Sequence, residues 1–170
     1  MSAVMLSHRL ASLGVDANVS SAGLLHTGEP AAALGVDVMA TRELDLTEHR
    51  SRRLEPTLVI DADLVLAMER AQLREVALLA PAVWDRCFTL KELARRGDLI
   101  GPRPRDESLG DWLARVSAGR AKSMLLGHDP ADDIADPYGG TRADFERTAS
   151  ELEALIDRVT LLAWGRAQSD

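Results

Sequence analysis

The run from Ala62 to Met68 limits the fold of this chain more than any other stretch of it. The run is mostly apolar and has polar residues on both sides, and its length suits a strand better than a helix. A strand whose apolar residues follow one another without alternation is typical of a parallel sheet that is covered on both faces. The run alone does not exclude a helix. Helical patterns before and after it nevertheless favour an α/β protein.

Two further strands are expected, at residues 15–19 and 82–88. Val15, Ala17 and Val19 alternate with polar or small residues and lead into a Ser-Ser-Ala-Gly loop. The segment 82–88 contains Cys87, the only cysteine of the chain. With the run at 62–68 these segments make three plausible strands, which is a small parallel sheet beside the helices expected around it.

The strongest predicted helix is the last one. Its apolar residues recur every three or four positions from Phe145 to Ala163, and Thr141 followed by Asp144 supplies a capping signal at its start. A loop rich in glycine, proline and arginine is expected at 97–105. The other helices are expected at 1–14, 29–34, 70–79, 89–96 and 109–116, with Gly14, Gly35 and Pro81 as helix-ending residues.

Composition narrows the class of protein. The 170 residues carry 20 basic and 27 acidic side chains, a formal net charge of −7, so a nucleic-acid partner is not expected. No apolar run is long enough to span a bilayer, and the first residues lack the basic lead of a signal peptide, so we expect a cytoplasmic protein with no membrane partner. One cysteine excludes a disulfide framework, and the four histidines show no metal-ligand spacing. A single domain over residues 1–170 is expected.

The segment Asp132–Gly140 carries the most candidate chemistry. Pro137 restricts Asp136 to extended geometry and holds its carboxyl group out from a turn, and Tyr138 could wall a crevice that binds a ring. The alternative interpretation is a solvated acidic turn that caps the last helix.

Two other segments offer polar groups with less specific patterns. Ser21 lies in a loop at the end of an expected strand, where α/β proteins bind ligands. His49 begins a His-Arg-Ser-Arg stretch that contains a titratable base, although an exposed polar turn is the commoner explanation. Cys87 has apolar neighbours, which favours a small core side chain over a reactive thiol.

Taken together and in order, several stretches resemble the low-molecular-weight protein tyrosine phosphatase family, and the Asp-Pro-Tyr placed just before the final helix is the most specific of them. The resemblance covers most of the chain. The matching stretches are His8–Gly14, Val19–Gly23, His49–Leu54, Ala62–Met68 and Asp136–Gly139, with Phe88–Arg95 resembling the actinobacterial branch.

The resemblance implies a fold, a reaction and residue roles. The fold would be flavodoxin-like, a parallel sheet in the order 2-1-3-4 with helices on both faces. The reaction would be hydrolysis of a phosphate monoester, such as phosphotyrosine in a protein, through a phosphocysteine intermediate and without a cofactor or metal. Asp136 would be the general acid, Tyr138 would lie against the substrate ring, and Ser21 and His49 would support the phosphate-binding loop by hydrogen bonds.

The sequence departs from this family at its catalytic motif, a Cys-x5-Arg loop that follows a central first strand. Cys87 cannot supply the motif, because the sixth residue after it is Leu93. We therefore expect a truncated sequence, with the missing strand and loop ahead of Met1 in an intact phosphatase. The alternative is a truncated pseudophosphatase or binding module without activity. The related arsenate reductases are disfavoured, because they need further cysteines.

Overall fold

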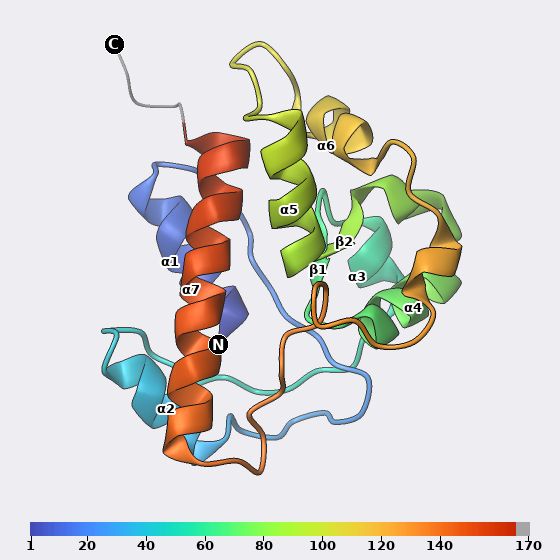
Figure 1. The fold of residues 1–170 in the computed structure, drawn as a ribbon. Coiled ribbons are helices and arrows are strands. Elements are labelled where there is room, and N and C mark those ends of the chain that lie inside the picture. The colour runs from blue at the N-terminus through green and yellow to red at the C-terminus, as the bar shows by residue number, and fades with distance from the viewer. Residues whose placement is uncertain (166–170) are drawn as a thin grey trace. The chain divides into compact units, whose positions relative to one another are not determined.

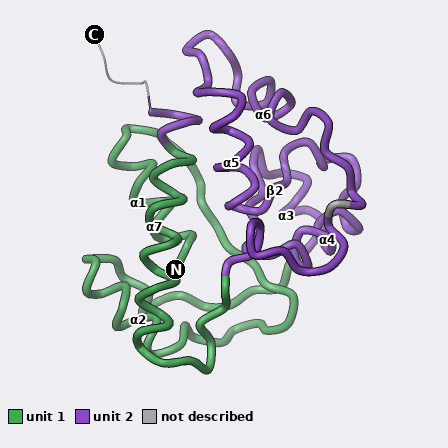
Figure 2. The backbone as a smooth tube through the Cα atoms, in the orientation of Figure 1, with its two compact units in different colours: residues 1–54, 135–160 green, residues 55–134, 161–170 purple. Residues whose placement is uncertain are grey.

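The computed structural model describes residues 1–165, apart from the side chain of Met124. These residues form two compact units (Figure 2): unit 1 comprises Met1–Leu54 and Ala135–Thr160, and unit 2 comprises Glu55–Ile134 and the residues from Leu161 onward. The single domain expected over the whole chain stays a prediction. No helix within residues 1–165 combines the length and the apolar character needed to cross a membrane.

Unit 1 is mainly helical. It contains α1 (Ser2–Ser12), α2 (Ala33–Ala40) and α7 (Arg142–Trp164) as far as Thr160 (Figure 1). The expected first helix is confirmed, and the chain leaves it through Gly14 at a positive φ of 70°. The core of the unit is formed by apolar side chains of the three helices, chiefly Met5, Leu10, Val38, Met39, Phe145, Ala149, Leu152, Ile156 and Val159.

The predicted cap of the last helix is present. The Thr141 hydroxyl donates to Asp144 Oδ2 at 2.7 Å, and the Thr141 backbone N–H donates to the same oxygen at 2.7 Å. The pKa of Asp144 is lowered to about 2. The bond from the Thr141 hydroxyl contributes most, followed by the bond from the Thr141 N–H and by the neighbouring Arg147. The carboxylate therefore stays ionised at the positive end of α7, where it stabilises the helix.

Helix α2 corrects the expected helix at 29–34. It runs over Ala33–Ala40, so Gly35 lies inside the helix and does not end it. Gly35 is buried, and a Cβ atom there would lie 3.4 Å from the ring of Phe145. The glycine permits close helix packing, a use that a sequence pattern cannot distinguish from a helix stop.

The strand expected at 15–19 is wrong. These residues have no regular secondary structure. The Val15 N–H donates to the Leu10 carbonyl at 2.9 Å and so completes the end of α1. A strand requires a hydrogen-bonded neighbour, and no other described segment pairs with residues 15–19.

Unit 2 contains the parallel sheet, which has two strands among the described residues, where three were expected. Strand β1 (Val65–Ala67) confirms the strand within 62–68, and it pairs in parallel with β2 (Cys87–Thr89), placing Leu66 opposite Phe88. The strand expected at 82–88 is largely wrong, because Pro81–Arg86 forms the 3₁₀ helix η1. Pro81 lies at its first position, where a fixed φ and a missing N–H suit a helical turn.

The remaining elements of unit 2 surround this pair of strands. The predicted helices 70–79 and 109–116 are confirmed, while the loop expected from residue 97 begins only after residue 100, because the helix before it is longer than predicted. Helices α4 (Arg70–Leu79) and α5 (Leu90–Ile100) both contact β2. The elements are α3 (Pro56–Ile60), α4 (Arg70–Leu79), α5 (Leu90–Ile100), α6 (Leu109–Ser117) and the short η2 (Lys122–Leu125).

Gly97 lies inside α5, and its place in the packing accounts for a glycine at this position. The helix packs so closely that a Cβ at Gly97 would lie 2.9 Å from Leu162 Cδ1 and 3.4 Å from the Trp112 ring. Gly97→Ala should therefore destabilise the protein by about 1 to 3 kcal/mol, although the same change in an open helix stabilises it. Chemical denaturation of the variant and of the unchanged protein measures the difference in their free energies of unfolding.

Gly110 in α6 provides the matched control. A Cβ there would meet only the Ser108 hydroxyl, at 3.8 Å. Gly110→Ala should raise the free energy of unfolding by about 0.5 to 1 kcal/mol, because alanine restricts the unfolded chain. The packing explanation fails if the two substitutions change stability in the same direction.

Candidate phosphate-binding cavity

Unit 1 contains a cavity of about 260 Å³ at the start of α1. The first turn of the helix forms one side of it, and Ser21 and the turn that leads to His49 form the rest. Its lining residues are Met1, Ser2, Ala3, Val4, Ser21, Asp45, Leu46, Glu48 and His49.

The start of α1 gives this cavity hydrogen-bond donors. Helix α1 begins at Ser2, and no side chain caps its first turn. The first backbone N–H groups of a helix have no acceptor within the helix, and they form its positive end. The positive end of a helix favours an anion with several oxygens, such as phosphate, whereas the carboxylates of Asp45 and Glu48 in the cavity lining oppose one.

Ser21 and His49, which the resemblance assigned to one task, lie on this same cavity. Ser21 is exposed and His49 is half-buried. Neither side chain hydrogen-bonds to another residue in the described part of the chain, whereas both backbone carbonyls do. The hydroxyl and the imidazole are therefore available to a group that enters the cavity.

The environment of His49 favours its neutral form. Burial first, and then the positive charges of the α-amino group and Arg50, lower the pKa of His49 below its ordinary 6.5. A neutral imidazole can donate from one nitrogen and accept at the other, which suits a residue that orients a loop.

The pKa of His49 can be tested directly. An NMR titration should place its midpoint below 6.5, with His49→Gln assigning the resonance. Because the unfolded chain then binds more protons than the folded chain, stability should fall as the pH drops below 6.5, and less so in His49→Gln. A midpoint at or above 6.5 would show that the imidazole is not shielded in this way.

Asp136 and Tyr138 lie in the loop before α7 and are not among the cavity-lining residues. Asp136 Oδ1 accepts a hydrogen bond from the Tyr138 N–H at 3.0 Å, which forms a local turn. The Thr148 hydroxyl donates to the carbonyl of Ala135 at 3.2 Å and connects this loop to α7. Both side chains are exposed, Tyr138 to 79%, so the carboxyl group and the phenol ring are accessible to a substrate.

Cys87 has the properties of a core residue, as its apolar neighbours predicted. It is 1% exposed, and its thiol donates to the Val83 carbonyl at 3.1 Å. Burial raises the pKa of Cys87 to about 11, so the reactive thiolate is scarce at neutral pH. Residues 1–165 also contain no group of three or more His, Cys, Asp or Glu side chains that could hold a metal ion.

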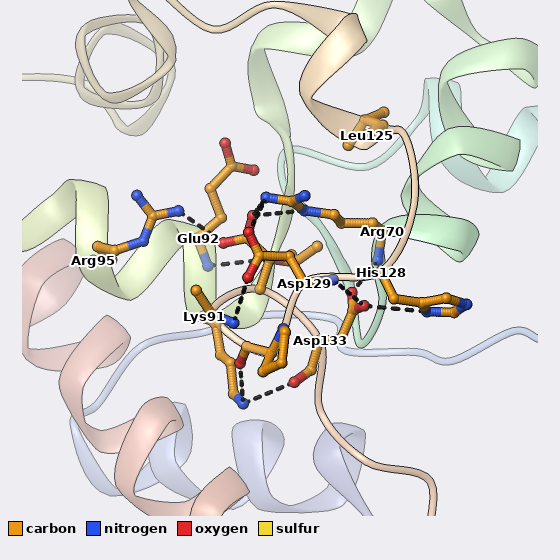
Figure 3. A network of polar contacts seen from close by, with 12 residues as sticks. Arg70, Lys91, Glu92, Arg95, Leu125, His128, Asp129 and Asp133 are labelled. Carbon is orange, nitrogen blue, oxygen red and sulfur yellow. Dashed lines mark hydrogen bonds and ion pairs between the residues drawn. The ribbon is translucent and has the colours of Figure 1, made fainter.

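A polar network in unit 2 has no counterpart among the sequence predictions (Figure 3). The sequence pattern predicts a turn at Asp132 that is either catalytic or solvated, yet Asp132 is only 5% exposed. One of its oxygens accepts from Arg70 Nε and Nη2 at 2.9 and 2.6 Å, and the other from Arg95 Nη2 at 2.7 Å. For Asp132, the solvated turn is therefore wrong.

The same network holds the residues around Asp132. Asp133 accepts from the backbone N–H groups of Arg70 and Asp129 at 2.7 and 3.0 Å, and Lys91 donates to the Asp133 carbonyl at 2.7 Å. Burial alone would raise the pKa of Asp133, but these N–H bonds and the nearby His128 hold it below its ordinary value. Arg70 and Asp132 are 62 positions apart, so no local pattern indicated the pairing.

The comparison with known families identifies the class of protein to which this chain belongs. The family model for low molecular weight phosphotyrosine protein phosphatase matches residues 1–108. The chain belongs to this family and has its flavodoxin-like fold.

Particular relatives support the assignment. The chain is 36% identical to a probable low molecular weight protein-tyrosine-phosphatase EpsP of Ralstonia solanacearum, over 60% of this chain and 71% of the relative. It is 40% identical to an EpsP of Ralstonia nicotianae over 45% of this chain, and spans about half, 53%, of that relative. Among solved structures, the low molecular weight protein tyrosine phosphatase from T. tengcongensis superposes with a TM-score of 0.68 at 26% identity, covering 93% of this chain and 86% of the other.

Proposed function

We propose that this chain forms the body of a cytoplasmic phosphatase that hydrolyses phosphate monoesters, chiefly phosphotyrosine in proteins, through a phosphocysteine intermediate. The observation that carries the proposal is the cavity where the uncapped start of α1 meets Ser21 and His49. The relatives named as tyrosine phosphatases support the choice of substrate.

The chemistry assigns a task to each part. A thiolate attacks phosphorus, while backbone N–H groups and an arginine hold the three equatorial oxygens. A carboxylic acid protonates the departing phenol and afterwards activates the water that hydrolyses the phosphocysteine. We assign the acid to Asp136 and the contact with the substrate ring to Tyr138.

The nucleophile and the phosphate-binding arginine are not among the 170 residues. The sequence contains no Cys-x5-Arg, and Cys87 is buried with a raised pKa. Activity in this proposal therefore depends on such a loop joined ahead of Met1. The cavity would hold the phosphate group of the substrate, and Ser21 and His49 would hydrogen-bond to the loop.

A comparison of two proteins tests this proposal: the 170-residue chain, and the same chain preceded by an apolar strand and a Cys-x5-Arg-Ser-Pro segment. The chain alone should not hydrolyse para-nitrophenyl phosphate. The extended protein should hydrolyse it, and Cys→Ser in the added loop should abolish the activity. Hydrolysis by the chain alone would contradict the proposal. A folded but inactive extended protein would favour the alternative, a pseudophosphatase that binds a partner.

A further inference from the structure

Three exposed arginines of unit 1, Arg50, Arg52 and Arg53, form what we call the arginine cluster. None of the three forms an ion pair with any carboxylate of the described residues. The side chains of Arg50 and Arg52 donate only to backbone carbonyls. The Arg53 side chain has no hydrogen-bond partner among the described residues.

Other arginines of the same unit differ in this respect. Arg9 pairs with Asp157 at 2.9 Å, Arg42 has a carboxylate partner in α7, and Arg142 and Arg147 pair with acidic side chains of their own helix. The chain has 27 acidic side chains against 20 basic ones, so carboxylates are abundant. The arginine cluster is thus a group of three arginines without an ion-pair partner among the described residues, although the carboxylates of Asp45 and Glu48 line the adjacent cavity.

The cluster lies beside the cavity. Arg50 Nη1 donates to the carbonyl of His49 at 2.8 Å, and Arg52 Nε donates to the carbonyl of Ser21 at 2.8 Å. Both carbonyls belong to residues that line the cavity. Two of the three arginines are therefore bonded directly to the cavity's own backbone.

The backbone that carries the cluster is held in place. Arg53 and Gly23 form an isolated parallel β-bridge through their backbones, and Arg50 and Pro30 form an isolated antiparallel one. The Leu54 N–H also donates to the Gly23 carbonyl at 2.8 Å. Ordered backbone lowers the entropic cost of binding, because the cluster does not have to be assembled when a ligand arrives.

We propose that the arginine cluster binds the carboxylates of acidic residues that flank the phosphorylated residue of a protein substrate. Guanidinium groups bind carboxylates through paired, charge-assisted hydrogen bonds, and Arg52 and Arg53 keep both terminal nitrogens free of intramolecular bonds. The excess of acidic residues elsewhere in the chain disfavours a nucleic acid as the ligand. The phosphorylated residue in this proposal rests on the proposed function, whereas binding of the acidic flank requires no catalysis.

Peptide binding to the 170-residue chain tests the proposal. A labelled, unphosphorylated peptide rich in glutamate should bind more tightly than its glutamine counterpart, as measured by fluorescence anisotropy at low salt. Arg50→Gln/Arg53→Gln should weaken binding of the glutamate peptide by about threefold to tenfold. The matched control Arg142→Gln/Arg147→Gln removes the same charge from paired arginines and should change the affinity by less than about twofold. The preference for glutamate should decrease at about 0.5 M salt, where charges are screened.

Several results would overturn the proposal. These are equal affinity for the two peptides, equal losses in the two double variants, or tighter binding of an oligonucleotide of the same charge. Arg50→Lys/Arg53→Lys keeps the charges but not the paired hydrogen bonds, so it should bind the glutamate peptide more tightly than the glutamine double variant and less tightly than the unchanged chain. Binding by the lysine variant that is no tighter than that of the glutamine variant would contradict the proposal. Inactivity of the extended protein would leave these affinities unchanged, so failure of the proposed function is distinguishable from failure of this inference.

Discussion

Replacing Arg120 by alanine should lower the free energy of unfolding by about 3 to 5 kcal/mol. The Arg120 side chain is only 1% exposed, and its Nε and Nη2 donate to the two oxygens of Glu92 at 2.7 and 2.8 Å. It also donates to the carbonyls of Trp84 and Cys87 at 3.0 and 2.7 Å and to the Ser117 hydroxyl at 3.4 Å. The guanidinium also lies 3.9 Å from the ring centre of Trp84 and 4.1 Å from that of Phe88. Alanine would leave Glu92 as a buried, unpaired carboxylate.

Arg115 is a close control for this prediction. It donates to the two oxygens of Glu107 at 2.7 and 2.8 Å, nearly the same geometry, but its side chain is 45% exposed. Arg115→Ala should lower the free energy of unfolding far less than Arg120→Ala, because water and salt screen the pair. Urea denaturation of both variants tests this difference. Similar decreases in the free energy of unfolding would show that burial does not determine how much each ion pair stabilises the protein. Arg120→Met/Glu92→Met should be less destabilised than Arg120→Ala, because no charge stays buried without a partner.

Asp136→Asn in the extended, active protein should lower kcat for phosphotyrosine by about 10²- to 10⁴-fold, the usual contribution of a general acid. Asparagine cannot protonate the leaving phenolate. The loss should be smaller for para-nitrophenyl phosphate, whose phenol leaves readily without a proton. KM should change little, since the proton is transferred only in the transition state.

Steady-state kinetics with both substrates separates the roles that Asp136 could have. Equal losses for the two leaving groups would contradict proton donation. Normal turnover with both would make Asp136 a structural turn residue, in agreement with its hydrogen bond to the Tyr138 N–H. Glu29→Gln, a change at another exposed carboxylate of unit 1, is the control and should leave kcat unchanged.

Helices whose ends are determined by residues close in the sequence could be predicted. The limits of α4 follow from its apolar period and from Pro81 just after it. The start of α7 follows from Thr141 and Asp144, three residues apart, which form the expected hydrogen bonds. In both cases the interacting groups lie within one helical turn of each other, so the sequence pattern contains the whole interaction.

Features that depend on distant partners could not be predicted. Residues 15–19 have the alternation of a strand, but a strand also needs a neighbour, which alternation does not guarantee. The burial of Asp132 depends on Arg70 and Arg95, which are 62 and 37 positions away. For the site, the structure puts Ser21 and His49 on one cavity, and the roles that the resemblance implies for these two residues and for Asp136 stay predictions.

The buried state of Cys87 has a practical consequence for labelling. Iodoacetamide reacts with thiolates, and a thiol that is 1% exposed with a pKa of about 11 offers almost none at neutral pH. In an extended protein, the added cysteine would therefore be the one thiol that alkylates quickly. The stoichiometry of labelling would then count functional nucleophiles, without any need to mutate the native cysteine. The onset of labelling at Cys87 would in turn report unfolding of unit 2.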